Sequence, residues 1–180
     1  MKTRLIFLGL IIAATIGSCT QDKESKVKLE ELKAKMNLEA QNKAIVQKLI
    51  DGMNSRDSMI YEEFYAPNCA LYFPSASAKA TTRAADFQST KRNWNAMPDV
   101  HWRIEEMIAE GDMVAARFSS SGTPKEEWNG IPASGKKFEI GGIFIVRIEN
   151  GKVIEQREDA DLLGLFQQLG MELKPADKKK

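Results

Sequence analysis

The second half of the chain constrains the fold most, because apolar and polar residues alternate there over four segments separated by short turn sequences. The segments cover residues 99–109, 112–122, 137–148 and 152–160. Alternation with a period of two is typical of strands with one buried face. The last two segments are joined by ENGK, and Asn-Gly favours a two-residue hairpin turn. We therefore expect an antiparallel meander over this half.

The first part of the globular region has helical periodicity instead. Ile45, Leu49 and Met53 recur at helical spacing and predict a helix that ends near residue 54. Helices followed by a meander indicate an α+β fold, in which helices pack on one face of a curled antiparallel sheet. The other expected elements are a short helix that Pro67 terminates, a short strand over 68–74, a helix over 84–96 and a closing helix over 161–169.

Residues 1–18 have the pattern of a signal peptide. Lys2 and Arg4 precede an apolar run that is too short to remain as a membrane span. The run ends in IGSC, which resembles the bacterial lipobox, and this resemblance implies that Cys19 becomes the lipidated first residue. An ordinary cleaved signal and an uncleaved anchor are the alternatives. Since Thr20 follows the cysteine, we expect the protein at the cell envelope, on the outer membrane.

The remaining chain divides by composition into a tether, a domain and a tail. Residues 19–37 are dense in Lys and Glu and read as a charged tether. Its apolar residues have helical spacing, so the alternatives are an extension of the next helix or pairing with a partner chain. Residues 38–172 are long enough for one globular domain. Residues 173–180 form a basic tail.

Charge and rare residues exclude several classes of function. Without residues 1–18, the 26 basic residues fall to 24 against 25 acidic ones, so nucleic-acid binding has no support. Lipidation of Cys19 would leave Cys69 as the one free thiol, and His101 is the sole histidine. That set predicts no metal site, no cofactor and no histidine-based nucleophile. His101 is also out of phase with Trp102 and is expected to face the opposite side of the sheet.

The stretch GIPASGKK fits part of a phosphate-binding loop, with Gly130, Gly135 and Lys136 at the required spacing. The remaining context does not fit. Lys137 stands where a Ser or Thr should reach magnesium, Pro132 removes a backbone donor, and a strand pattern follows instead of a helix. We interpret the stretch as a turn between two strands.

Three strings together resemble the SnoaL-like polyketide (ester) cyclase family. They are MPDVHWRIEEMIAEGDMVAARF, WNGIPASGKKFEIGGIFIVRIENGKVIEQRED and DLLGLFQQLGM, and the resemblance extends over about residues 40–171. The family belongs to the nuclear transport factor 2-like folds and is related to ketosteroid isomerase and limonene epoxide hydrolase. The resemblance implies a cone-shaped curled antiparallel sheet with N-terminal helices on its concave face.

The resemblance also implies a chemistry. Characterised members close a ring by intramolecular aldol addition without a metal or cofactor, using a carboxylate on the last strand as general acid and base. Matching through the hairpin places Glu158 at that position, where a buried carboxyl would have a raised pKa. The family's histidine falls at Phe144, its glutamine at Gly142 and its asparagine near Leu71, so the polar partners are replaced by apolar or absent side chains.

Period two supplies the other candidate site residues. Ile154, Gln156, Glu158 and Ala160 share one face of the last strand, and by the resemblance this face points inward. Gln156 and Asp161 are the expected neighbours of Glu158. The alternative is that Glu158 pairs with an arginine or lies at the wet mouth of the cone. The residues expected to form the pocket are Tyr72, Trp94, Trp102, Gly142 and Phe144. Of these, Trp94 and Trp102 are expected in the core or in the pocket wall, and Trp128 is expected at a surface or rim.

Three functions remain after this reading. The first is a lipid-anchored envelope protein whose pocket binds a small, mostly apolar molecule. The alternative is an enzyme, a cyclase, lyase or isomerase acting on a carbonyl compound with Glu158 as general acid and base. The third is an oligomeric scaffold, a homodimer formed through the outer face of the sheet.

Overall fold

The computed structural model describes the backbone of residues 3–172 and 174, and the side chains of residues 23–172 and 174. Two compact units are present, Met1–Leu38 and Glu39–Lys180. The expected signal peptide over residues 1–18 and the Cys19 side chain lie outside the residues whose side chains are described. Most of the expected basic tail also lies outside them.

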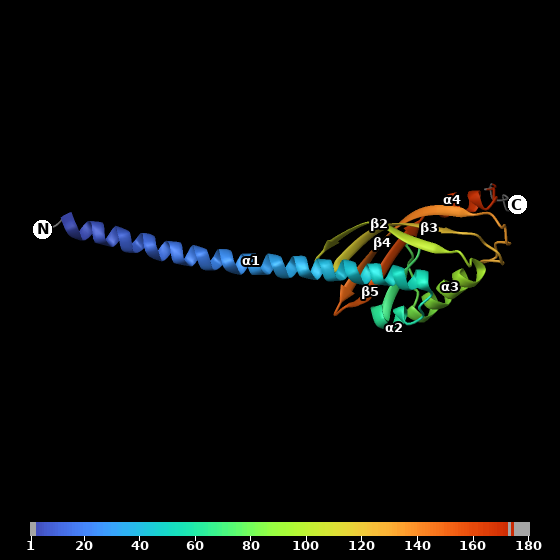
Figure 1. Ribbon diagram of the computed structural model, residues 1–180, viewed down its shortest axis with the longest axis horizontal. Helices are drawn as coiled ribbons and strands as arrows, with labels where there is room; N and C mark the ends of the chain where they lie inside the picture. Colours follow the sequence, from blue (N-terminus) through green and yellow to red (C-terminus); the bar gives the residue numbers. More distant parts are fainter. Residues whose placement is uncertain (1–2, 173, 175–180) are drawn as a thin grey trace. The chain divides into compact units, whose positions relative to one another are not determined.

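The first unit consists of helix, since α1 covers Thr3–Ser55 (Figure 1). The residues expected to form the tether, 19–37, lie within this helix. No Gly or Pro interrupts residues 20–51, and Glu30 and Lys33 pair one turn apart at 2.9 Å. Leu29, Leu32 and Met36 are exposed on this helix. Within the described part of the chain, no helix has the length and apolar character needed to cross a membrane.

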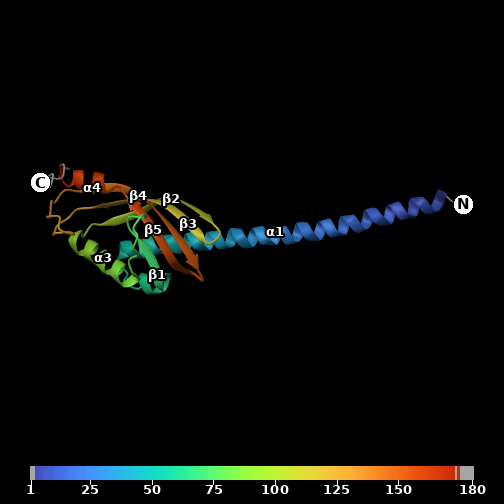
Figure 2. The same cartoon turned by 180° about the vertical axis from the view of Figure 1, so that it is seen from behind.

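The second unit is a curled five-stranded sheet with helices, as the sequence predicts (Figures 1 and 2). The strands lie in the order β1-β5-β4-β3-β2. Besides the end of α1, the helices are α2 (Ile60–Phe64), α3 (Arg83–Ala96) and α4 (Leu162–Gln168). The strands are β1 (Tyr65–Tyr72), β2 (His101–Glu110), β3 (Met113–Gly122), β4 (Phe138–Glu149) and β5 (Lys152–Ala160).

The sheet is antiparallel from β2 to β5, and β1 is the exception. β1 runs parallel to β5, with Leu71 opposite Gln156. It also begins three residues earlier than predicted and includes Pro67. The register between Tyr65 and Ala70 is irregular. A proline is tolerated there because β1 is an edge strand and the hydrogen-bond ladder is interrupted at that point.

Both turn predictions are confirmed. Asn150 and Gly151 have φ of 50° and 75°, the positive values that a type I′ hairpin turn requires. Residues 123–137 connect β3 to β4, and an isolated bridge joins Trp128 to Ile131 within them. Gly130 and Gly135 have positive φ there. A strand follows this loop, so it lacks the helix that a phosphate-binding loop needs.

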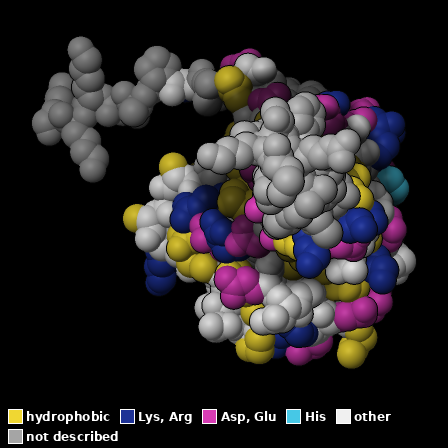
Figure 3. Space-filling model, turned by 90° about the vertical axis from the view of Figure 1, so that its left-hand side faces the viewer, with side chains coloured by type: hydrophobic (Ala, Val, Ile, Leu, Met, Phe, Trp, Pro, Cys, Tyr) yellow, Lys and Arg dark blue, Asp and Glu magenta, His cyan; other side chains and the backbone are white. Residues whose placement is uncertain are grey.

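The core lies between the sheet and the helices. Val46, Leu49 and Ile50 of α1 are buried in one cluster with residues of β3 and β4, such as Val114 and Val146. A second cluster joins the end of α3 to α4. On the face displayed in Figure 3, side chains of both charge signs are interspersed with apolar ones.

Candidate functional site

A cavity of about 300 Å³ lies within the second unit, Glu39–Lys180. Side chains of α1, α3 and all five strands line it. β2 contributes Trp102, and α4 contributes Leu162 and Leu165. The volume is at the lower end of the range for small-molecule sites. The hollow that the family resemblance implies is therefore present, and the core side chains do not fill it.

One wall of the cavity is apolar and comes from β3 and β4. Phe118, Ile140, Phe144 and Val146 line it and are buried. The rings of Phe118 and Phe144 pack with centroids 5.8 Å apart. The apolar character expected at Phe144 is thus a property of the whole wall.

Gly142, an expected pocket residue, does not line the cavity. A Cβ at this position would lie 2.4 Å from the ring of Phe118 and 2.7 Å from the carbonyl oxygen of Asp159. Gly142 therefore supports the site indirectly, because only glycine lets the Phe118 ring pack against β4.

Glu158 and Gln156 of β5 line the cavity side by side. The amide Nε2 of Gln156 donates to Glu158 Oε2 at 2.9 Å, and Tyr65 donates its hydroxyl to Gln156 Oε1 at 2.9 Å. Ala160 also lines the cavity, as the alternation predicts. The alternation fails earlier, because a register shift at the start of β5 places Val153 in the core.

The surroundings of Glu158 give its carboxyl an unusually high pKa. Burial raises the pKa of Glu158 from its ordinary 4.5 to about 7, and the charge of Asp86 adds to this effect. The hydrogen bond from Gln156 opposes it. Glu158 pairs with no arginine among the described residues, since its hydrogen-bond partner is Gln156, and its side chain is half-buried in the cavity wall.

A second carboxyl group, Asp86 of α3, also lines the cavity, and the sequence analysis did not identify it. Tyr61 of α2 donates its hydroxyl to Asp86 Oδ2 at 2.9 Å and lies 2.7 Å from the Thr90 hydroxyl. Burial raises the pKa of Asp86, while the hydrogen bond from Tyr61 opposes this rise. The sequence does contain a signal for the polar wall that α3 provides. Asp86, Ser89, Thr90 and Asn93 form a polar stripe at helical spacing, and all four line the cavity.

Tyr61 and Tyr65, which donate to Asp86 and Gln156, are neighbours. Their rings are stacked, with centroids 5.0 Å apart and planes at 16°. Burial raises the pKa of both hydroxyls, so both remain protonated and act as donors. Tyr61 therefore serves the Asp86 side and Tyr65 serves the Glu158 side.

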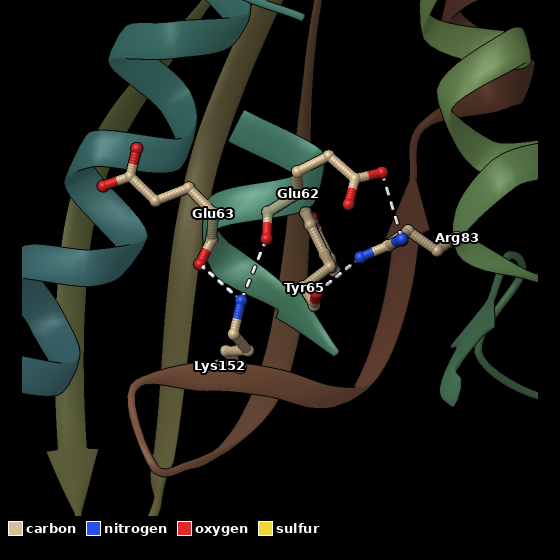
Figure 4. A network of polar contacts seen from close by, with 5 residues as sticks. All are labelled: Glu62, Glu63, Tyr65, Arg83 and Lys152. Carbon is tan, nitrogen blue, oxygen red and sulfur yellow. Dashed lines mark hydrogen bonds and ion pairs between the residues drawn. The ribbon is translucent and has the colours of Figure 1, made fainter. Parts of the chain in front are cut away.

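The junction between the end of α2 and the start of β1, residues 62–65, is held by hydrogen bonds from two sides (Figure 4). Arg83 of α3 donates to the Tyr65 carbonyl at 3.2 Å and to the Glu62 carboxylate at 3.0 Å. Lys152 of β5 donates to the carbonyl oxygens of Glu62 and Glu63 at 2.9 and 3.1 Å, which satisfies the end of α2. The elements that carry Asp86 and Glu158 are thus the ones that fix the tyrosines.

The expected aromatic pocket residues separate into two groups. Tyr72 and Trp102 line the cavity, and so does Trp128, whose indole donates to Asn93 Oδ1 at 2.7 Å. The guanidinium of Arg157 lies 4.0 Å above the Tyr72 ring. Trp94 does not line the cavity. It is buried and packs edge-on against Phe87.

Asp161 and His101 lie away from the cavity. Asp161 is the N-cap of α4, where its Oδ1 accepts the Gly164 N–H at 2.8 Å. Its expected role beside Glu158 is therefore replaced by a capping role. His101 is exposed, while its neighbour Trp102 lines the cavity, as the strand alternation predicts.

The charges of the cavity are all acidic. Among its lining residues, which all belong to the described part of the chain, are Asp86 and Glu158 but no Lys, Arg or His. Within that part, no group of three His, Cys, Asp or Glu side chains is placed to hold a metal ion. The site combines two hydrogen-bonded carboxyl groups with aromatic and aliphatic walls.

Two cyclases are similar to this chain in sequence. Aklanonic acid methyl ester cyclase DnrD of Streptomyces peucetius is 24% identical over 131 residues, which is 70% of this chain and 88% of DnrD. The corresponding cyclase DauD of Streptomyces sp. strain C5 is 35% identical over 69 residues, which is 37% of this chain and 43% of DauD.

Two solved structures resemble the fold. TsrD from Streptomyces laurentii has a TM-score of 0.62 at 30% identity and covers 71% of this chain and 96% of TsrD. AclR from Streptomyces galilaeus has a TM-score of 0.66 at 23% identity and covers 73% of this chain and 97% of AclR. Residues 43–169 match the SnoaL-like polyketide cyclase family, so the chain belongs to this family.

Proposed function

We propose that the protein is an enzyme of the cyclase or isomerase type, which acts on a small carbonyl compound with Glu158 as general acid and base. The observation that carries this proposal is the half-buried Glu158 side chain in the wall of a cavity, where burial raises the pKa of its carboxyl to about 7. A group with this acidity is present in both protonation states near neutral pH. The protein's family membership and its similarity to two cyclases support the same class of reaction.

The reaction needs one group that first accepts and then returns a proton. The ionised Glu158 takes a proton from a carbon next to a carbonyl, and the electrons of that C–H bond form an enolate. In a cyclase, the enolate carbon attacks a second carbonyl of the same molecule, which forms a C–C bond and an alkoxide. Protonated Glu158 then gives its proton to the alkoxide, or to another carbon in an isomerase, and the carboxylate is restored.

The donors around Glu158 differ from the family's pattern. Phe144, Gly142 and Leu71 occupy the positions of its histidine, glutamine and asparagine. In their place, Tyr65 and Gln156 form a hydrogen-bonded chain that ends on Glu158. The hydroxyl and amide groups of the α3 stripe and of Ser120 also line the cavity. These are the groups that would face a developing oxyanion.

A ring-closure assay tests the proposal. Aklanonic acid methyl ester, taken from the names of the two cyclase relatives, is one substrate, and a naphthyl β-keto methyl ester in deuterated buffer is the second. We expect ring closure of the first or accelerated exchange of the acidic C–H of the second. Glu158→Gln should lower the rate by roughly 100-fold or more. Rates equal to those of buffer alone, or equal rates for both proteins, would contradict the proposal.

The same assay separates catalysis from simple ligand binding, which the sequence alone favours. A carrier needs the apolar wall but no hydrogen-bonded carboxyl group in the cavity. Binding of the keto ester without any acceleration, unchanged by Glu158→Gln, would support a carrier. Retained binding with lost turnover in Glu158→Gln would support the enzyme.

We also propose that the chain is a lipid-anchored envelope protein. The support is the sequence of residues 1–19, since several acyl chains on Cys19 give stable anchoring. Metabolic labelling with an alkyne fatty acid, followed by membrane fractionation, tests this. Label and membrane association should both be lost in Cys19→Ser. Soluble wild-type protein without label would contradict the anchor.

The expected homodimer is a further proposal. Ile143 and Ile145 of β4 are 54% and 41% exposed, and Ile108 of β2 is 68% exposed. Such an apolar set on one face of a sheet favours burial in an interface. Light scattering should give twice the monomer mass, and Ile143→Glu should reduce it to the monomer mass. A monomeric wild type would contradict the dimer.

A further inference from the structure

The cavity has an asymmetric distribution of charge and polarity. The wall from α3 presents Asp86 and the polar groups of Ser89, Thr90 and Asn93, whereas the wall from β3 and β4 is largely apolar. No cationic side chain of the described chain lines the cavity to balance its two carboxyl groups. A ligand that enters must therefore be compatible with acidic groups on two sides.

Only one of the two carboxylate oxygens of Asp86 accepts a hydrogen bond from the described residues. The Tyr61 hydroxyl donates to Oδ2, and among the described residues no hydrogen bond reaches Oδ1. Arg83 lies one turn earlier on α3, but its guanidinium is engaged by Tyr65 and Glu62. The charge of Asp86 thus has a hydrogen-bond donor beside it and no ion-pair partner.

We propose that Asp86 selects the charge of the ligand, so that the cavity takes a neutral or cationic compound with one apolar face and rejects carboxylates and phosphates of the same size. This inference rests on the proposed use of the cavity for a small carbonyl compound, and it specifies which class of such compounds enters. A hydroxyl or ammonium group would lie toward Asp86, where it can donate to Oδ1. The ring or chain of the ligand would lie against Phe118 and Phe144.

The surroundings of Asp86 support this assignment. The groups that interact with Asp86 are Tyr61 of α2, Tyr65 and Cys69 of β1, and Glu158 of β5, and none of them is cationic. Burial raises the pKa of both carboxyl groups, and the charge of Asp86 adds to the rise at Glu158. An anionic ligand would meet these carboxyl groups with no cation in the described wall of the cavity to offset the repulsion.

Three naphthalene derivatives of similar size test the proposal by titration calorimetry. They are naphthoate, its methyl ester and naphthylmethylamine, used at about pH 7.5, where the acid is ionised and the amine is protonated. We expect the wild-type protein to bind the ester and the amine at least about tenfold more tightly than the acid, because like charges in an enclosed site repel. The wild-type comparison requires no variant and is independent of any folding defect.

Two variants then locate the source of the selectivity. Asp86→Asn has nearly the same shape and keeps an acceptor for the Tyr61 hydroxyl, so the fold should persist, and circular dichroism verifies this. We expect the preference for the ester over the acid to fall to within about threefold in this variant, and amine binding to weaken. Glu63→Gln removes the same charge at an exposed position outside the cavity wall. It should leave all three affinities unchanged.

The outcomes are distinct. Equal binding of acid and ester by the wild type, or an unchanged ratio in a folded Asp86→Asn protein, would overturn the inference. A similar loss of selectivity in Glu63→Gln would also overturn it, because a long-range charge effect would then be sufficient. Charge selectivity without any turnover would overturn the proposed enzyme and leave this inference intact. Turnover without selectivity would do the reverse.

Discussion

The two walls of the cavity differ in how they are built and in what they can do. The wall from β3 and β4 consists of close-packed apolar side chains, and its shape depends on Gly142 admitting the Phe118 ring. The second wall is made by α3 and by the inner face of β5, the strand next to β4. It carries Asp86 and Glu158, which accept hydrogen bonds from Tyr61 and Gln156. Shape is therefore set by one wall and charge by the other.

The two walls should respond to different kinds of change. An apolar wall responds to changes of volume, because interiors are close-packed. A wall of buried carboxyl groups responds to pH and to loss of donors, because burial penalises the charged form. The two tyrosines supply donors to the second wall, since Tyr61 donates to Asp86 and Tyr65 donates to Gln156. Perturbations of each wall should therefore have different signatures.

The largest expected effect is the pH dependence of stability contributed by Glu158. Its pKa is 4.5 when unfolded and about 7 when folded. The unfolded state loses this proton first, so stability is full below about pH 4.5 and falls as pH rises through 7. The loss corresponds to roughly 3 kcal/mol. Urea unfolding from pH 4.5 to 8 should show this loss in wild type, and Glu158→Gln should lack it.

Asp159 is a matched control for the sign of that effect. It is adjacent to Glu158 but accepts hydrogen bonds from the backbone and side chain of Ser75, which lower the pKa of Asp159. Its contribution to stability is present above the unfolded pKa and is lost as pH falls through the folded one. Asp159→Asn should therefore reduce the loss of stability at low pH. A wild-type protein as stable at neutral as at acidic pH would contradict the buried state of Glu158.

The second effect concerns the apolar wall. Gly142→Ala places a methyl group 2.4 Å from the Phe118 ring and should destabilise the protein by about 1–3 kcal/mol. Gly141→Ala is the control, because its Cβ would meet only the Phe118 carbonyl oxygen at 3.7 Å. That change should be within about 0.5 kcal/mol. Urea midpoints at one pH give both values, and equal values for the two variants would show that the wall is not tightly packed.

The sequence predicts the strand side of the cavity better than the helix side. Strand alternation is a short-range signal that puts Gln156 and Glu158 on one face of β5, and the family resemblance directs that face inward. Both side chains line the cavity, as does Phe144. Asp86 is different, because its importance depends on a helix crossing to face β5. Its polar stripe on α3 is equally typical of a solvated helix face. Only the tertiary arrangement distinguishes the two.

Other differences have the same cause. Nothing in the local sequence shows that β1 pairs with β5 in parallel, since the partners are distant in the chain. The sequence predicts Trp94 in the core or in the pocket wall, and Asp161 beside Glu158. The structure places the Trp94 indole in the core and the Asp161 carboxylate at the N-cap of α4. Local periodicity therefore predicts elements and faces, and packing decides which polar groups meet.

The third effect concerns the tyrosine donors of the second wall. Tyr61→Phe removes the hydroxyl that donates to Asp86 and contacts Thr90, so it should cost about 1–2 kcal/mol. The pKa of Asp86 should rise further, because the lost hydrogen bond was lowering it. Carbon NMR of the Asp86 carboxyl measures this directly. Tyr65→Phe is the matched control, since its hydroxyl serves Gln156 and should leave Asp86 nearly unchanged. Equal shifts in both variants would contradict separate roles.

The smallest effect is expected at the exposed part of the junction in Figure 4. Glu62→Gln removes the ion pair with Arg83, but the Glu62 side chain is 63% exposed, and such pairs contribute about 0–1 kcal/mol. Arg83 retains its hydrogen bond to the Tyr65 carbonyl, and Lys152 retains both carbonyls at the end of α2. We therefore expect a stability change below about 0.5 kcal/mol, decreasing with added salt, and unchanged affinity for the naphthoate ester. A loss above about 1.5 kcal/mol, or altered affinity, would mean that this ion pair positions the tyrosines, and the two walls would then not be independent.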